Sequence, residues 1–237
     1  MYVPIIILHG WNLYGNKYLP LIKILRDKKY RVYYPDFPGF GKNNKIDRPL
    51  CLDDYVNFLN KYVSERKLKK FVFMAHSFGG RVAIKYTIKF PHKVHSLILT
   101  GVPGYVPVRS SKILFFLTLS KIGRIIFSLP MLSEYRTEMR NMLHRLARAS
   151  DYNQTNGYMR DTFKTIIRED LDEDMKNIKQ HTLLVWGEND RTVPVSLAYK
   201  MQKTFHNSDL LIVKNTNHRL PFQNSWEFYH TVKKYLQ

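Results

Sequence analysis

The chain has 237 residues, of which 44% are hydrophobic and 24% charged, and this composition excludes a largely disordered protein. Its net charge of +19 comes without a basic helix or an aromatic stacking motif, so we expect no nucleic-acid partner. We interpret the charge mainly as surface solubility, and attraction of an anionic or lipid-like substrate, or contact with a membrane surface, is the less favoured interpretation.

Short apolar runs alternate with amphipathic helical patterns along most of the chain. The predicted strands are, in chain order, residues 3–8, 30–34, 70–74, 94–100, 182–187 and 210–213. Helices are predicted between most of them, and one opens at residues 52–55 with Asp53 as its expected cap. This alternation predicts an α/β fold with a doubly wound, mostly parallel sheet of about six strands. Its ligand crevice should lie at the carboxyl ends of the strands.

Residues 107–176 interrupt this alternation and are predicted to be helical. We interpret them as a lid inserted into a core formed by residues 1–106 and 177–237. Residues 113–132 are very apolar, but charged residues, a glycine and a proline interrupt them, which argues against a membrane-spanning helix. Core-facing lid helices are therefore favoured over an interfacial membrane segment.

Ser77 lies on a tight turn between a predicted strand and a predicted helix. Ala75 and Gly79 are the small residues that such a turn requires two positions before and after the serine, and Gly80 lets the helix approach the sheet. A serine hydroxyl becomes an effective nucleophile when a strained turn of this kind exposes it beside a base. The pattern alone is common, but its place between strand and helix favours a catalytic serine over a structural one.

Together with this turn, four further segments make the chain similar to the α/β-hydrolase superfamily over nearly its whole length. They are His9-Gly10-Trp11, the turn at 36–41, the loop at 187–194 and Asn217-His218. The resemblance implies an oxyanion loop at the first segment, an acid-bearing loop at the third and a base-bearing loop at the fourth. It also implies that the sheet lacks the two strands with which the family usually begins.

The resemblance assigns the nucleophile to Ser77, the acid to Asp190 and the base to His218, in the chain order typical of this fold. Glu188 is the competing acid, although Asp190 matches the family spacing. The other histidines that follow the acid are His206 and His230. Of the three, only His218 comes directly after the last predicted strand, where a loop can face the crevice.

The backbone amides of Trp11 and Phe78 are expected to form the oxyanion hole of this site. We expect no cofactor and no metal, since no clustered His/Cys spacing is present. The only cysteine, Cys51, cannot form an intramolecular disulfide, and the first residues lack the basic region of a signal peptide. A cytoplasmic protein is therefore expected, and its oligomeric state is left open.

The function predicted from these residues is hydrolysis of a small carboxylic ester through an acyl-enzyme. Carbon–carbon bond hydrolysis or lyase chemistry on the same triad is the alternative, because the fold does not choose among these reactions. An aminopeptidase is less favoured. It would need the acidic cluster 169–174 to hold a peptide amino terminus, and we interpret that cluster as a solvated edge of the lid. The alternative outside enzymes is a noncatalytic receptor that kept the fold.

Overall fold

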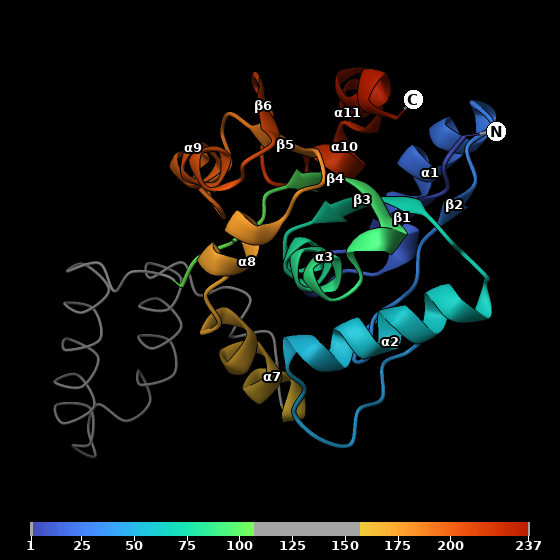
Figure 1. Cartoon of the computed structure of the whole chain (residues 1–237), viewed down its shortest axis with the longest axis vertical. Helices are drawn as coiled ribbons and strands as arrows, with labels where there is room; N and C mark the ends of the chain where they lie inside the picture. The colour runs from blue at the N-terminus through green and yellow to red at the C-terminus, as the bar shows by residue number, and fades with distance from the viewer. Residues whose placement is uncertain (1, 107–156, 237) are drawn as a thin grey trace, which may run out of the picture.

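The computed structural model describes residues 2–106 and 157–236, and its centre is one parallel sheet of six strands (Figure 1). The strands are β1 (Ile5–Leu8), β2 (Val32–Tyr33), β3 (Phe71–His76), β4 (Val94–Thr100), β5 (Thr182–Gly187) and β6 (Ser208–Val213). Their order is β2-β1-β3-β4-β5-β6, and every neighbouring pair is parallel. The predicted α/β fold and strand number are thereby confirmed.

The helices of the described residues connect these strands or follow the last of them. They are α1 (Leu19–Asp27), α2 (Leu52–Glu65), α3 (Phe78–Lys89), α7 (Tyr158–Ile167), α8 (Asp172–Asn177), α9 (Val195–Thr204), α10 (Leu220–Gln223) and α11 (Ser225–Val232). Short 3₁₀ turns lie at Gly15–Tyr18, Pro91–Lys93 and Lys233–Tyr235. Parallel neighbours cannot be joined by a tight hairpin, so helical crossover connections of this kind are what a parallel sheet requires.

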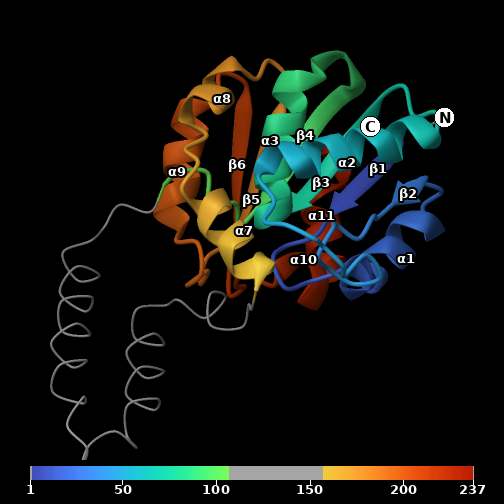
Figure 2. The same ribbon diagram turned by 90° about the horizontal axis from the view of Figure 1, so that it is seen from below.

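Helices cover both faces of the sheet, so the core has two layers of apolar side chains (Figures 1 and 2). Successive side chains of a strand point to opposite faces. In β3, Phe71 and Phe73 belong to the cluster under α2 and α3, whereas Val72 and Met74 belong to the cluster under α1 and α11. Burial on both faces explains why the central strands are continuously apolar.

Several bounds differ from the expectations, since β6 begins at Ser208 rather than at 210, β1 begins at Ile5 and β3 extends to His76. Two further differences have a local cause. Helix α2 is capped by Cys51 rather than by Asp53, because the Asp54 carboxylate accepts hydrogen bonds from both the backbone N–H (2.9 Å) and the thiol (3.3 Å) of Cys51. Asp53 instead forms an ion pair with Lys89 on α3, at 2.9 Å. The second strand is shorter than predicted because β2 is an edge strand that pairs only with β1.

Residues 107–156 of the predicted lid, including the apolar stretch 113–132, lie outside the described residues. The rest of that range forms α7 and α8. Helix α7 lies beside the start of α2 (Figure 1), where the Thr162 hydroxyl accepts a hydrogen bond of 2.8 Å from the Leu50 amide. Helix α8 places Met175 in the same apolar cluster as α3.

Arg81, the fourth residue of α3, joins the two chain segments that flank residues 107–156. Its buried guanidinium donates hydrogen bonds to the backbone oxygens of Pro103, on the segment after β4, and of Ile166 and Glu169, at the end of α7. Burial lowers the pKa of Arg81 to about 10, while nearby carboxylates oppose this, so the guanidinium is protonated at neutral pH. One cation thus fixes both segments against α3, the helix that follows Ser77.

Candidate active site

Ser77 occupies the sharp turn between β3 and α3. Its backbone has φ 52° and ψ −117°, a conformation that side-chain-bearing residues rarely adopt, and its N–H donates to the Thr100 oxygen at 2.9 Å. The turn needs Gly79, because a Cβ there would lie 2.6 Å from the Leu8 oxygen and 2.7 Å from the His9 oxygen. A strained, partly exposed serine at a strand end is the arrangement expected of an activated nucleophile.

Asp190 and His218 meet on the loops that follow β5 and β6. His218 Nδ1 donates to Asp190 Oδ2 at 2.7 Å, and Asp190 Oδ1 accepts the amides of Thr192 and Val193, both at 2.8 Å. The carboxylate is buried and held by three donors, so it fixes the imidazole tautomer with a proton on Nδ1. His218 Nε2 is then left as a proton acceptor.

The imidazole of His218 lies beside the serine turn. A Cβ on Gly101, next to the Thr100 that binds the Ser77 amide, would lie 2.7 Å from both Nδ1 and Cε1 of His218. On the other side, the ring centroid of His76 is 4.6 Å from that of His218. Within residues 2–106 and 157–236, Ser77 Oγ makes no hydrogen bond, and such catalytic contacts are often loose before substrate binds.

The amides expected to form the oxyanion hole face no protein acceptor in the described part of the chain. The N–H groups of Trp11 and Phe78 are absent from its backbone pairs, the latter because it opens α3. Buried amides are nearly always paired, so two free ones beside a candidate nucleophile suit a developing oxyanion. The Trp11 ring packs against Phe40, Phe78 and Phe163, with centroids 5.0, 5.3 and 5.0 Å away, which gives the site an apolar wall.

The competing residues lie elsewhere. Glu188 is exposed and accepts the Asn215 amide at 3.1 Å, so it organises the loop rather than contacting His218. His206 is exposed at the amino end of β6, and His230 is exposed on α11, where it packs on Trp226. Of the residues weighed from the sequence, the structure therefore brings Asp190 and His218 together.

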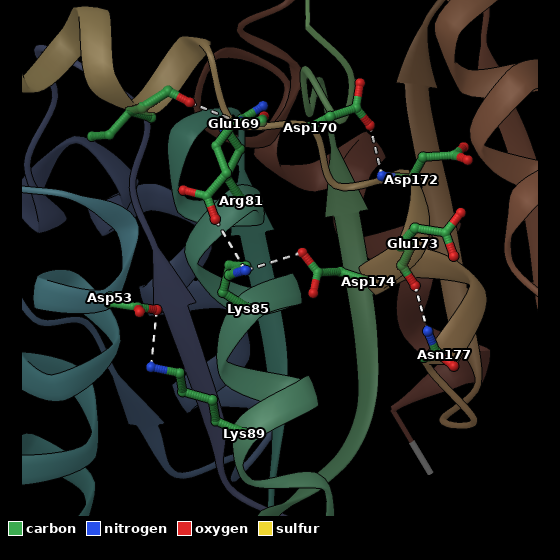
Figure 3. Close-up of polar contacts among 11 residues, drawn as sticks. Asp53, Arg81, Lys85, Lys89, Glu169, Asp170, Asp172, Glu173, Asp174 and Asn177 are labelled. Carbon is green, nitrogen blue, oxygen red and sulfur yellow. Dashed lines mark hydrogen bonds and ion pairs between the residues drawn. The ribbon is translucent and has the colours of Figure 1, made fainter.

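The acidic cluster 169–174 is engaged by groups of the same chain (Figure 3). Lys85 pairs with Glu169 at 3.0 Å and Asp174 at 3.2 Å, and Asp170 accepts the amides of Val106 and Asp172. Lys176 pairs with Asp172 and Glu173, both at 2.7 Å. These contacts leave little capacity to hold a peptide amino terminus, as the aminopeptidase alternative requires.

Histidines 9 and 76 are buried polar groups that sequence reasoning did not assign to the site. Burial lowers the pKa of His9 to about 4, and its Nε2 accepts the Phe37 amide at 3.0 Å, which ties the oxyanion loop to the turn at 36–41. His76 precedes Ser77 directly, and both of its ring nitrogens are hydrogen bonded. Its partners are 58 and 142 positions away, so no local pattern could have revealed them.

In the part of the chain that the structure covers, no three His, Cys, Asp or Glu side chains gather as a metal site would require. Nor does any helix in that part have the length and hydropathy needed to cross a bilayer.

Comparisons with known proteins agree with this architecture. A family model described as alpha/beta hydrolase fold matches residues 3–225. A 2-hydroxy-6-oxononadienedioate/2-hydroxy-6-oxononatrienedioate hydrolase of Escherichia coli K12 is 23% identical over 96% of this chain and 82% of its own. A meta-cleavage product hydrolase from Pseudomonas fluorescens superposes with a TM-score of 0.70 at 19% identity, over 98% of this chain and 90% of that one. An esterase from Exiguobacterium antarcticum gives 0.75 at 20% identity, over 99% and 91%.

Proposed function

The chain belongs to the alpha/beta hydrolase fold family, and on that premise we propose that it is a serine hydrolase whose nucleophile is Ser77. The observation that carries this proposal is the 2.7 Å contact between His218 and a buried Asp190, made on two strand-end loops beside the strained serine turn. A noncatalytic receptor would have no need of a buried carboxylate that fixes a histidine next to a free hydroxyl.

In the proposed mechanism, His218 Nε2 takes the Ser77 proton as Oγ attacks a carbonyl carbon, and Asp190 stabilises the imidazolium. The Trp11 and Phe78 amides bind the oxyanion, each donor contributing about 3 kcal/mol in comparable sites. The leaving group departs with the proton from His218. Water, deprotonated by the same imidazole, then releases the acyl group as a carboxylic acid and restores the Ser77 hydroxyl.

For the bond that is cleaved, we propose a carbon–carbon bond next to a ketone as the first candidate. The relatives matched over 96% of this chain are named for 2-hydroxy-6-oxo-dienedioates, which support this class better than the ester predicted from the sequence. In such a substrate Ser77 would attack the 6-oxo carbon, and the carbon fragment that leaves would accept the proton. The net charge of +19, interpreted above mainly as surface solubility, would also attract a dianionic substrate.

Ester hydrolysis is the second candidate, because the same acyl-enzyme serves both reactions and the fold is shared with solved esterases. A direct comparison of the two classes tests the choice. We expect a higher kcat/KM for a 2-hydroxy-6-oxo-dienedioate, followed by loss of its dienol absorbance, than for any p-nitrophenyl ester from acetate to palmitate. Turnover of the esters alone would assign the protein to the second class, and no turnover above that of Ser77→Ala would remove both.

A further inference from the structure

We propose that Tyr18 and His76 are positioning residues, which hold the oxyanion loop, the serine turn and the base-bearing loop in one hydrogen-bonded bridge. This inference rests on the proposed function, since it concerns how the same site is kept in register. The three loops come from distant parts of the chain, and the bridge is a continuous series of hydrogen bonds that links them.

The bridge begins at the oxyanion loop. The Gly10 N–H, one residue before the amide expected to bind the oxyanion, donates to the Tyr18 hydroxyl at 3.3 Å. The Tyr18 hydroxyl lies 2.7 Å from His76 Nδ1, and His76 Nε2 lies 2.9 Å from the backbone oxygen of His218. A carbonyl oxygen can only accept, so His76 Nε2 carries the proton and donates it. His76 Nδ1 is then unprotonated and accepts a hydrogen bond from the Tyr18 hydroxyl, so the position of every proton in the bridge is determined.

Burial keeps this arrangement in a single protonation state. His76 and Tyr18 are both almost fully buried. Burial lowers the pKa of His76 well below its usual value, with a smaller contribution from the neighbouring His218. A neutral His76 does not repel the imidazolium that forms on His218 during the proposed reaction, which a second cation 4.6 Å away would do.

As a result, hydrogen bonds hold His218 at two points, its ring and its backbone oxygen. Asp190 fixes the ring through Nδ1, and His76 fixes the backbone through the carbonyl oxygen. His76 itself immediately precedes Ser77, so the residue that restrains the base also sets the start of the serine turn. Without the bridge, the His218 ring would keep its contact with Asp190, but no hydrogen bond from His76 would fix the backbone of His218 relative to Ser77.

The test compares Tyr18→Phe with Tyr86→Phe. Tyr86 is a buried tyrosine on α3 whose hydroxyl, like that of Tyr18, donates one hydrogen bond, here to Asn60 at 3.3 Å, but it has no contact with the bridge. We expect Tyr18→Phe to lower kcat between about 10- and 100-fold with little change in KM, because a small misplacement of reacting groups is costly. Tyr86→Phe should lose a similar amount of stability and keep the wild-type kcat.

Variants of His76 provide a second readout. His76→Gln can retain a donor near the Nε2 position, whereas His76→Asn retains a polar group only near Nδ1. We therefore expect His76→Gln to keep more activity than His76→Asn, and Tyr18→Phe to add little to the defect of His76→Asn. The NMR signal of the His218 Nδ1–H should also shift in Tyr18→Phe and not in Tyr86→Phe, independently of turnover.

The outcomes separate this inference from the proposed function. Wild-type kcat and an unshifted His218 signal in Tyr18→Phe would overturn the bridge while leaving the hydrolase proposal intact. A shifted signal in a wild-type protein that shows no Ser77-dependent turnover would instead overturn the proposed function, and with it the catalytic value of the bridge.

Discussion

Replacing His218 by alanine is expected to lower kcat by about 10⁴-fold or more while the fold is retained, because the imidazole that would accept the Ser77 proton is lost. His218 is only partly buried, and Asp190 keeps the amides of Thr192 and Val193 as hydrogen-bond donors, so the chain should still fold without the imidazole. The measurement is kcat on the best substrate found for the wild type, with circular dichroism to verify folding.

The matched controls are the two other histidines that follow Asp190 in the chain. His206→Ala and His230→Ala remove exposed rings outside the site and should leave kcat within about twofold of the wild type, since surface substitutions rarely act at a distance. A His218→Ala protein that kept a tenth of the wild-type kcat would show that the base has been assigned to the wrong residue. Loss of activity in His206→Ala instead would point to the same error.

Replacing Arg81 by methionine is expected to lower the free energy of unfolding by about 3 kcal/mol or more. Methionine fills much of the arginine volume but donates no hydrogen bond, so the backbone oxygens of Pro103, Ile166 and Glu169 lose their common donor. Each buried acceptor left without a partner costs about 1 to 3 kcal/mol, although water can satisfy those nearest the surface. Urea unfolding at neutral pH measures the difference.

Arg48→Met is the matched control for this prediction. Arg48 forms a bidentate pair with Asp54, but its side chain is 58% exposed, and exposed pairs contribute between about 0 and 1 kcal/mol. Arg81→Lys should fall between the two, because an ammonium keeps the charge but cannot reach all three oxygens. If Arg81→Met were no less stable than Arg48→Met, the guanidinium would not be what holds the flanking segments of residues 107–156 to α3.

The sheet could be predicted because its strands carry strong local signals. Runs such as 94–100 and 182–187 are mostly apolar, and the strands observed there have the predicted bounds. The edge strand was predicted too long, since apolar residues at 30–34 do not indicate how many of them find a pairing partner. The Cys51 cap was missed because a thiol is rarely the capping group and the reciprocal contact comes from the Asp54 side chain.

Some parts of the candidate site have a signature in the sequence, and others do not. The turn at Ser77 and the loops of Asp190 and His218 have sequence signatures, because tight backbone geometry restricts which residues fit. The Tyr18–His76 bridge and the Arg81 contacts have none, since each joins groups that only the folded chain brings together. The triad also does not indicate whether the substrate is a ketone or an ester, because the same three residues can act on both.

The identity of the nucleophile is tested most directly by covalent labelling with a fluorophosphonate, followed by mass spectrometry of the digested protein. We predict a single stoichiometric adduct on Ser77, absent from Ser77→Ala and unchanged in Ser96→Ala, which removes a buried serine of the adjacent strand β4. An adduct on a different residue, or equal labelling of the wild type and Ser77→Ala, would contradict the assignment of Ser77 as the catalytic serine.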